Sequence, residues 1–160
     1  MRITRYKVML DDCRKNILVK ESSTNYSQEK QLNSPNKIVD MFNHIFNASK
    51  LAEEYVWVLA MNNKNHCIGV FELSHGTVNM SLISPREIFV RLCLLGAVNF
   101  VLVHNHPSGD TTPSREDELT TDKIHGAGLM MGIDMLDHII IGDGCYYSFN
   151  ENGRMEVQEK

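Results

Sequence analysis

The chain reads VLVHNHPSGDTTPSREDE at residues 101–118, and this segment decides how the sequence folds and where its chemistry lies. It completes an apolar run, VNFVLV at 98–103, of the kind that a strand shows when both of its faces are covered. Two prolines and a glycine then predict a loop. Ser114, followed three residues later by Asp117, is typical of a capping box at a helix start. The segment therefore predicts a central strand that passes through a loop into a helix.

Helix and strand patterns alternate on both sides of this segment. Ser34-Pro35 is typical of a helix start, and Ser84-Pro85-Arg86-Glu87 is another, with Glu87 as the reciprocal member of a capping box. Short apolar runs separated by turn residues predict strands, whereas the polar stretch 21–33 predicts a loop or linker. The expected helices cover about 34–48, 84–96 and 114–131, and the expected strands cover 3–10, 17–20, 55–61, 67–73, 98–103, 135–141 and 145–149. This order predicts an α/β fold with a mixed sheet and helices on its faces.

The length of 160 residues suits one compact domain. We expect two short strands and a polar linker at 1–33, the main domain at 34–150 and a C-terminal tail at 151–160. A content of 42% hydrophobic and 22% charged residues indicates a soluble globular protein, and no apolar run approaches the length of a membrane span. The N-terminus lacks a signal-peptide pattern, so we expect a cytoplasmic protein with no membrane partner. The four cysteines form no C-x-x-C pair, which favours reduced thiols over a thiolate metal site.

The distribution of charge argues weakly against a general nucleic-acid-binding protein. Twenty acidic residues against 16 basic ones give a formal charge of −4, and phosphate contacts require positive surface. The balance is uneven, since residues 1–20 hold six Lys or Arg against two Asp, whereas residues 109–160 hold eleven acids against four bases. The basic N-terminal segment predicts either a solvated edge strand or a local basic face. Nucleic acid is therefore a possible partner but not the favoured one.

His104 and His106 stand two residues apart at the end of the central strand, so an extended backbone directs both rings to the same side. Two neutral imidazoles, one carboxylate and a water are the open ligand set of catalytic zinc. Asp117 is the candidate third ligand, because Gly109 permits a sharp turn that returns the chain towards the histidines. Taken alone, Ser114 and Asp117 would be explained by helix capping, and the histidines by turn positions. Their conjunction at the carboxyl end of a buried strand favours metal binding.

These residues also resemble a known family. His104-x-His106-Pro107, the six residues that lead to Ser114, and Arg115-Glu116-Asp117 resemble the JAMM (MPN-plus) metalloprotease signature, and HNHPSGD with PSREDE is similar to its bacterial RadC-like branch. FELSHGTVN and SPREI upstream and LDHIIIGDG downstream extend the resemblance over roughly residues 34–149. The resemblance implies a three-layer α/β/α fold similar to cytidine deaminases. It also implies one Zn²⁺ per chain, held by His104, His106 and Asp117, with Ser114 stabilising the oxyanion.

The family also uses a glutamate on an upstream strand, and Glu72 in GVFELSHGT matches it in position. The resemblance implies that this residue takes a proton from the water that the metal activates and passes it to the leaving amine. Glu72 would otherwise be an outward residue on a half-exposed strand, Glu87 is explained by its capping box, and Glu53 and Glu54 by solvation before a strand. His138 either orients the site from a neighbouring strand or is a hydrogen-bonded core histidine.

The function that we expect is a zinc-dependent hydrolase that cleaves a peptide or isopeptide bond in an unidentified peptide or protein. Two alternatives remain: a DNA-repair-associated nucleic-acid-binding protein, and an interaction module that binds metal without turnover. Longer RadC-like proteins carry an N-terminal helical segment, and only about 33 residues precede the first matching helix here, which weakens the DNA-binding alternative. Insertions of the kind that grip ubiquitin in eukaryotic relatives are not apparent between Asp117 and Leu136, so ubiquitin is not the expected substrate.

Overall fold

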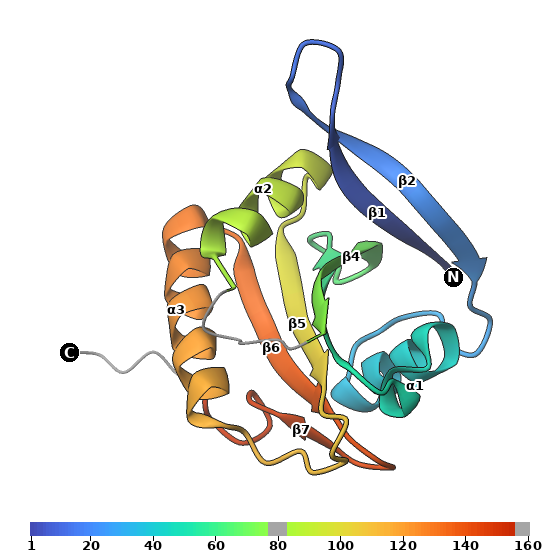
Figure 1. Cartoon of the computed structure of the whole chain (residues 1–160), viewed down its shortest axis with the longest axis vertical. Coiled ribbons are helices and arrows are strands. Elements are labelled where there is room, and N and C mark those ends of the chain that lie inside the picture. Colours follow the sequence, from blue (N-terminus) through green and yellow to red (C-terminus); the bar gives the residue numbers. More distant parts are fainter. Residues whose placement is uncertain (77–82, 156–160) are drawn as a thin grey trace.

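In the computed structural model, which describes residues 1–76 and 83–155, a mixed sheet of seven strands carries helices on both faces (Figure 1). The strands are β1 (Arg2–Leu10), β2 (Asn16–Asn25), β3 (Glu54–Met61), β4 (Cys67–Gly76), β5 (Asn99–Asn105), β6 (Asp134–Ile141) and β7 (Tyr146–Ser148). The helices are α1 (Pro35–Phe46), the short 3-10 turn η1 (Ala48–Lys50), α2 (Pro85–Leu95) and α3 (Arg115–Met131). The strand order is β2-β1-β4-β3-β5-β6-β7, with parallel pairing between β1 and β4 and between β5 and β6. Residues 77–79 of the FELSHGTVN stretch and residues 156–160 of the expected tail lie outside the described residues.

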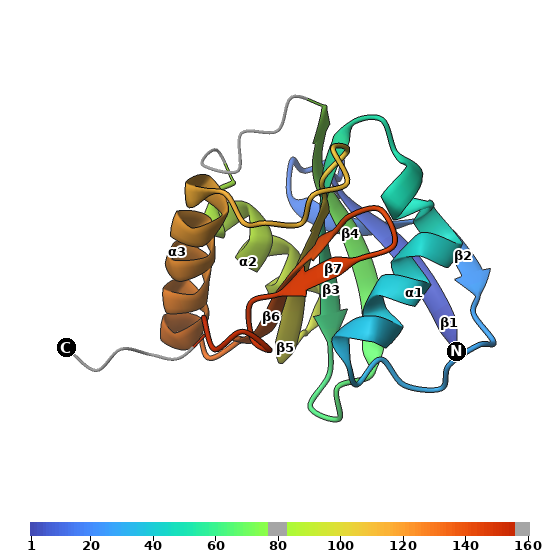
Figure 2. The same ribbon diagram turned by 90° about the horizontal axis from the view of Figure 1, so that it is seen from below.

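The protein has three layers, because the sheet separates α1 from α2 and α3 (Figure 2). Side chains alternate between the faces of each strand, so every central strand contributes to two apolar cores. Trp57 and Val103 belong to the core beneath α1, whereas Val56 and Leu102 belong to the core beneath α2 and α3. The expected three-layer α/β/α architecture with a mixed sheet is confirmed.

Strand β5 occupies the middle of the sheet, between β3 and β6. Every residue of β5 after Asn99 is buried, including His104 and Asn105 at its end. The continuous apolar run of the sequence is therefore that of a strand covered on both faces, as predicted. Neighbouring strands hold β5 on both edges, so the position of the residues directly after it is well defined.

The three helix starts differ from one another in their capping. Ser114 forms the expected capping box with Asp117 at the start of α3. The side chains of Ser34 and Ser84 make no capping hydrogen bond, although each lies at the N-cap position before a proline. The capping box predicted for Ser84 and Glu87 is therefore wrong; Glu87 instead pairs with Arg91 one turn further along α2, at 2.9 Å.

The N-terminal segment belongs to the same sheet as the rest of the chain. β1 and β2 pair along their whole length, with Arg2 opposite Asn25, so β2 extends into the stretch that the sequence predicted as a loop. The sequence misses this part because β2 is exposed on both faces over much of its length, and such a strand shows no apolar alternation. β2, with Lys20, lies at the edge of the sheet, whereas β1, with Arg2, Arg5 and Lys7, lies between β2 and β4.

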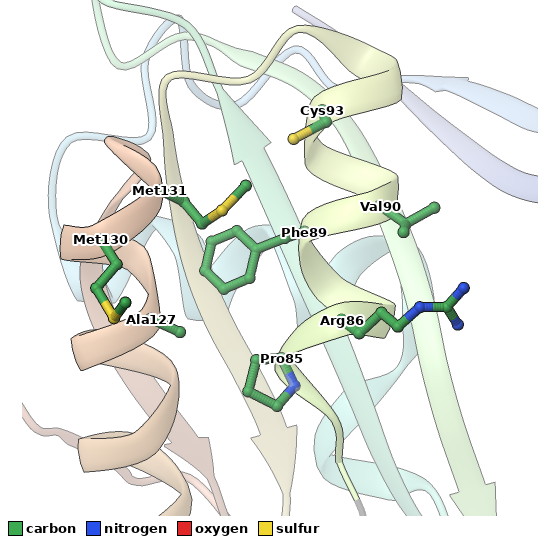
Figure 3. A pocket seen from close by; sticks show the side chains of 8 residues that line it. All are labelled: Pro85, Arg86, Phe89, Val90, Cys93, Ala127, Met130 and Met131. Carbon is green, nitrogen blue, oxygen red and sulfur yellow. The ribbon is translucent and has the colours of Figure 1, made fainter.

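An apolar groove of about 450 Å³ lies between α2 and α3 (Figure 3). Phe89 of α2 and Met131 of α3 point towards each other across it, and Met130 is 90% exposed at its edge. Its lining residues are Pro85, Arg86, Phe89, Val90, Cys93, Ala127, Met130 and Met131. The groove lies at the C-terminal half of α3, so it is separate from Ser114 and Asp117 at the N-terminal end. Among the described residues, no helix is long and apolar enough to span a bilayer.

The packing of α3 against the start of β6 predicts opposite effects for alanine at two of its glycines. A Cβ atom at Gly128 would lie 2.7 Å from the carbonyl oxygen of Ile133, whereas one at Gly126 would meet no atom within 4 Å. We expect Gly128→Ala to lower the free energy of unfolding by about 1–3 kcal/mol through overpacking. The matched variant Gly126→Ala should raise it by roughly 0.5–1 kcal/mol through helix propensity. Urea denaturation measures both, and equal effects of the two substitutions would contradict this packing.

Candidate metal centre

The end of β5 brings the two predicted histidines together. Their Nε2 atoms lie 3.0 Å apart. His104 is fully buried, and His106, directly after the end of β5, is partly buried. Gly109 has φ = 82°, a left-handed conformation that favours glycine, and the sharp turn places the carbonyl oxygen of Asp110 2.7 Å from His106 Nδ1. A carbonyl oxygen only accepts, so His106 carries its proton on Nδ1. In the neutral form of His106, Nε2 then carries the lone pair that can bind a metal.

The start of α3 brings Asp117 to the same point. Its Oδ1 lies 3.3 Å from His104 Nε2, and its Oδ2 lies 3.6 Å from His106 Nε2. Oδ2 also accepts hydrogen bonds from the backbone N–H and the hydroxyl of Ser114, at 2.8 and 2.7 Å. Ser114 Oγ in turn accepts from the N–H of Asp117 at 3.1 Å, which completes the capping box. The helix cap thus fixes the orientation of the predicted third ligand.

The separations of these donor atoms fit one zinc ion. Ligand atoms at about 2.0–2.1 Å from a tetrahedral zinc lie about 3.3 Å from one another. The observed separations lie on both sides of that value: 3.0 Å between the two nitrogens, 3.3 Å from His104 to Oδ1 of Asp117 and 3.6 Å from His106 to its Oδ2. Two imidazole nitrogens and one carboxylate oxygen are also the donors that zinc accepts in catalytic sites. The residues present therefore fit the metal that the family resemblance implies.

The protonation states of His104 and Asp117 favour metal binding, whereas Asp117 raises the pKa of His106, so a metal competes with a proton for that ring. Burial lowers the pKa of His104, against the opposing effect of Asp117. Burial works to raise the pKa of Asp117, but the neighbouring side chains of His104, His106 and Ser114 outweigh that effect and hold the pKa below its usual range. A neutral imidazole and an ionised carboxylate are the forms that coordinate a metal.

A carboxylate that the sequence analysis assigned to solvent joins this group. Glu54 is the first residue of β3, and a carboxylate oxygen of Glu54 lies within 4.8 Å of the ligand nitrogens of His104 and His106. Burial raises the pKa of Glu54, and the charge of His106 partly opposes the shift. The Glu54 carboxylate lies farther from the two histidine rings than the Asp117 carboxylate does. The raised pKa of Glu54 suits a group that accepts and returns a proton.

The structure does not bring Glu72, the predicted catalytic glutamate, to the histidines. Glu72 pairs with Trp57 in the register of β3 and β4, whereas His104 pairs with Val56 in the register of β3 and β5. Adjacent residues of a strand face opposite sides, so Glu72 lies on the α1 side of the sheet and His104 on the other. The Glu72 carboxylate binds the guanidinium of Arg5 at 2.7 Å and the ring of His75 at 2.8 Å, which makes it part of the contact between β1 and β4.

Asn105, between the two histidines, holds the backbone around Glu54. Its Oδ1 accepts from the N–H of Tyr55 at 2.8 Å, and its Nδ2 donates to the carbonyl oxygen of Glu53 at 3.0 Å. Both bonds reach the backbone at the start of the neighbouring strand β3. These two bonds place the residues on either side of Glu54, and thereby direct Glu54 towards His104 and His106.

Sequence reasoning also missed Thr121, one turn after Asp117 on α3. Its hydroxyl lies 2.7 Å from His138 Nδ1, and the other ring nitrogen of His138 lies 2.8 Å from His104 Nδ1. The spacing of four residues from Asp117 was the available signal, since it puts both side chains on one face of a helix. His138 is thus confirmed as a hydrogen-bonded core histidine, and the bond that it makes is to a ligand candidate.

Comparisons with known proteins agree with this geometry. Residues 32–154 match the family model described as the RadC-like JAB domain. The chain belongs to the RadC-like JAB domain family. It is 42% identical over 122 residues to a UPF0758 protein of Geotalea uraniireducens and 44% identical over 120 residues to one of Pelobacter propionicus. These alignments cover 76% and 75% of this chain but 53% and 52% of the relatives, so the chain spans about half the length of the curated relatives that it matches.

Membership of the RadC-like JAB family leaves two classes of function to consider. Membership is compatible with a metal-dependent hydrolase of the JAB type and with a role related to DNA repair. The name UPF0758 specifies no activity. The choice between these functions therefore depends on the chemistry of the site itself.

The geometry predicts that His104 and His106 are both required for metal binding. The double variant His104→Ala, His106→Ala should lose the one zinc per chain that we expect, because two of three protein ligands are gone. The matched control is His44→Ala, His66→Ala, in which two exposed histidines are removed. Metal analysis by mass spectrometry on protein purified without chelator gives the zinc content. Equal zinc in both double variants would contradict the assignment.

Proposed function

We propose that this chain is a zinc-dependent hydrolase of the JAMM type that cleaves a peptide or isopeptide bond in a peptide or protein substrate. One observation carries the proposal: two imidazole nitrogens lie 3.0 Å apart with a carboxylate oxygen of Asp117 within 3.6 Å of each, and the Glu54 carboxylate, whose pKa burial raises, lies beside them. A metal that only stabilised the fold would need no such second carboxylate. The combination suits hydrolysis by an activated water.

His104, His106 and Asp117 would hold the zinc and leave one position open. When bound, the metal lowers the pKa of a water to about 7 and polarises the carbonyl of the scissile bond. Asp117 stays oriented throughout, because its Oδ2 accepts a hydrogen bond from the backbone N–H of Ser114 at 2.8 Å. The three protein ligands therefore keep their geometry while the substrate enters and leaves.

Glu54 would serve as the general base and then as the general acid. Its carboxylate takes the proton of the attacking water and passes it to the nitrogen of the leaving amine, so one side chain serves both proton transfers. The half-buried position of Glu54 supports this role, since burial raises its pKa towards the working pH. Amide cleavage in particular needs such a donor, because an amine leaves only after its nitrogen is protonated.

Ser114 would support the charge that develops on the substrate. Its hydroxyl lies at the rim of the centre and donates to Asp117 Oδ2 at 2.7 Å. Rotation of the hydroxyl about the Cα–Cβ bond would redirect this donor to an oxyanion beside the metal, while the backbone N–H of Ser114 continues to hold Asp117. Capping and catalysis are then successive uses of one residue.

The proposal predicts different outcomes when glutamine replaces Glu54 and when it replaces Glu72. Glu54→Gln keeps the shape but cannot accept a proton, so we expect turnover to fall by roughly 10²–10⁴-fold with zinc retained. Glu72→Gln, on the opposite face of the sheet, should keep turnover and lose only part of its contact with Arg5. A peptide library screened by mass spectrometry supplies the substrate for both assays. Loss of activity in Glu72→Gln alone, or metal-dependent cleavage of DNA that Glu54→Gln abolishes, would contradict the proposal.

A glycine at position 114 separates capping from catalysis. Glycine at the N-cap costs only a few tenths of a kcal/mol relative to serine, so Ser114→Gly should keep nearly all of the stability. It should also keep zinc, because the backbone N–H still donates to Asp117. We expect kcat to fall by about 10²–10³-fold through loss of the oxyanion donor. Thermal unfolding and initial rates measure the two effects, and unchanged kcat would return Ser114 to a purely structural role.

A further inference from the structure

A chain of hydrogen bonds leads from α3 through β6 to the metal centre. Thr121 Oγ1 lies 2.7 Å from His138 Nδ1, and His138 Nε2 lies 2.8 Å from His104 Nδ1. All three side chains are at most 1% exposed. The ring of His138 stacks on Phe149 with a centroid distance of 4.8 Å and an interplanar angle of 9°. Water cannot supply alternative partners here, so each nitrogen depends on the next group in the chain.

The position of each proton follows from the first link. Thr121 Oγ1 also lies 2.7 Å from the backbone carbonyl oxygen of Asp117. A carbonyl only accepts, so the single hydroxyl proton of Thr121 lies on that bond. His138 Nδ1 must then donate to Thr121, which leaves His138 Nε2 without a proton. His104 Nδ1 donates to this nitrogen, and His104 Nε2 is left as a bare lone pair directed at His106 and Asp117.

We propose that Thr121 and His138 are positioning residues that hold His104 in the tautomer with its proton on Nδ1 and Nε2 free for the metal. The inference rests on the proposed metal site and adds to it the reason why His104 is ready to bind. A ligating histidine commonly donates its second ring N–H to a protein group that fixes its tautomer and orientation. At His106 a loop carbonyl does this directly. At His104 no backbone acceptor is used; a neutral histidine accepts, and Thr121 sets which of its nitrogens does so.

The arrangement also links the geometry of α3 to the chemistry of β5. Thr121 lies one turn after Asp117, so the helix that presents the carboxylate ligand also selects the tautomer of the histidine ligand. If Thr121 donated to His138 instead, His138 would donate to His104, and the proton of His104 would occupy Nε2. That tautomer has no lone pair at the metal position. A single hydroxyl therefore decides between a competent and an incompetent His104.

Two substitutions at position 121 test the chain of hydrogen bonds from Thr121 through His138 to His104. Thr121→Val keeps the shape and removes the hydroxyl, and Thr121→Ser restores it. The first measurement is the tautomer of His104 in metal-free protein at pH 8, from ¹⁵N chemical shifts of the ring nitrogens. The second is zinc affinity by competition with a chromophoric chelator. Gly128→Ala, which perturbs α3 away from this chain of hydrogen bonds, is the control for lost stability.

We expect wild-type His104 to carry its proton on Nδ1, and Thr121→Val to gain the Nε2–H tautomer and lose roughly 10–100-fold in zinc affinity. Thr121→Ser should recover both readouts, and Gly128→Ala should change neither. A proton on Nε2 of His104 in the wild type would overturn the proposal, even if the valine variant failed to fold. Unchanged zinc affinity and tautomer in Thr121→Val would also overturn it. Because the NMR readout needs neither metal nor substrate, absence of hydrolysis would count against the proposed function and leave this inference standing.

Discussion

His104 Nε2 and His106 Nε2 lie 3.0 Å apart at the end of a buried strand, and a carboxylate oxygen of Asp117 lies within 3.6 Å of each of them. Lone pairs and a carboxylate at such distances repel one another unless a cation or a proton lies among them. The surrounding structure maintains this convergence. The covered strand β5 fixes His104, the turn at Gly109 fixes His106 through a carbonyl, and the capping box fixes Asp117. The stability of the fold therefore maintains an arrangement that suits a bound cation.

The capping box shows how one pair of residues meets two requirements. Oδ2 of Asp117 accepts the hydrogen bonds of Ser114, while Oδ1 is directed at His104. A carboxylate has enough lone pairs for both uses. Capping and metal binding are therefore compatible interpretations of the Ser-x-x-Asp pattern. The cap also lowers the conformational freedom of the ligand before any metal arrives, which is the general advantage of a preorganised site.

The sequence predicted the architecture and the two histidines well, because both depend on local patterns. The apolar run of β5 predicts that this strand is buried, and the spacing of His104 and His106 predicts that their rings lie on the same side of it. Glu54 and Glu72 could not be distinguished in this way. β3 and β4 carry apolar residues on both faces, so the sequence pattern does not show on which side of the sheet each glutamate lies. Only the register with β5 shows that Glu54 and His104 lie on the same side. Thr121 was missed for a related reason, since its partner His138 lies on β6 and hydrogen bonding produces no periodic pattern in the sequence.

The central claim is that the site is a zinc centre with Asp117 as third protein ligand and Glu54 beside it as a proton acceptor. Both carboxylates lie near the two histidines, so the ligand assignment is the point to test. The most direct measurement is a crystal structure of zinc-loaded protein with anomalous scattering recorded at the zinc edge. We expect one anomalous peak about 2.0–2.2 Å from His104 Nε2, His106 Nε2 and one oxygen of Asp117, with the Glu54 carboxylate outside bonding distance. A peak coordinated by Glu54 in place of Asp117, or no peak at the histidines, would contradict the account.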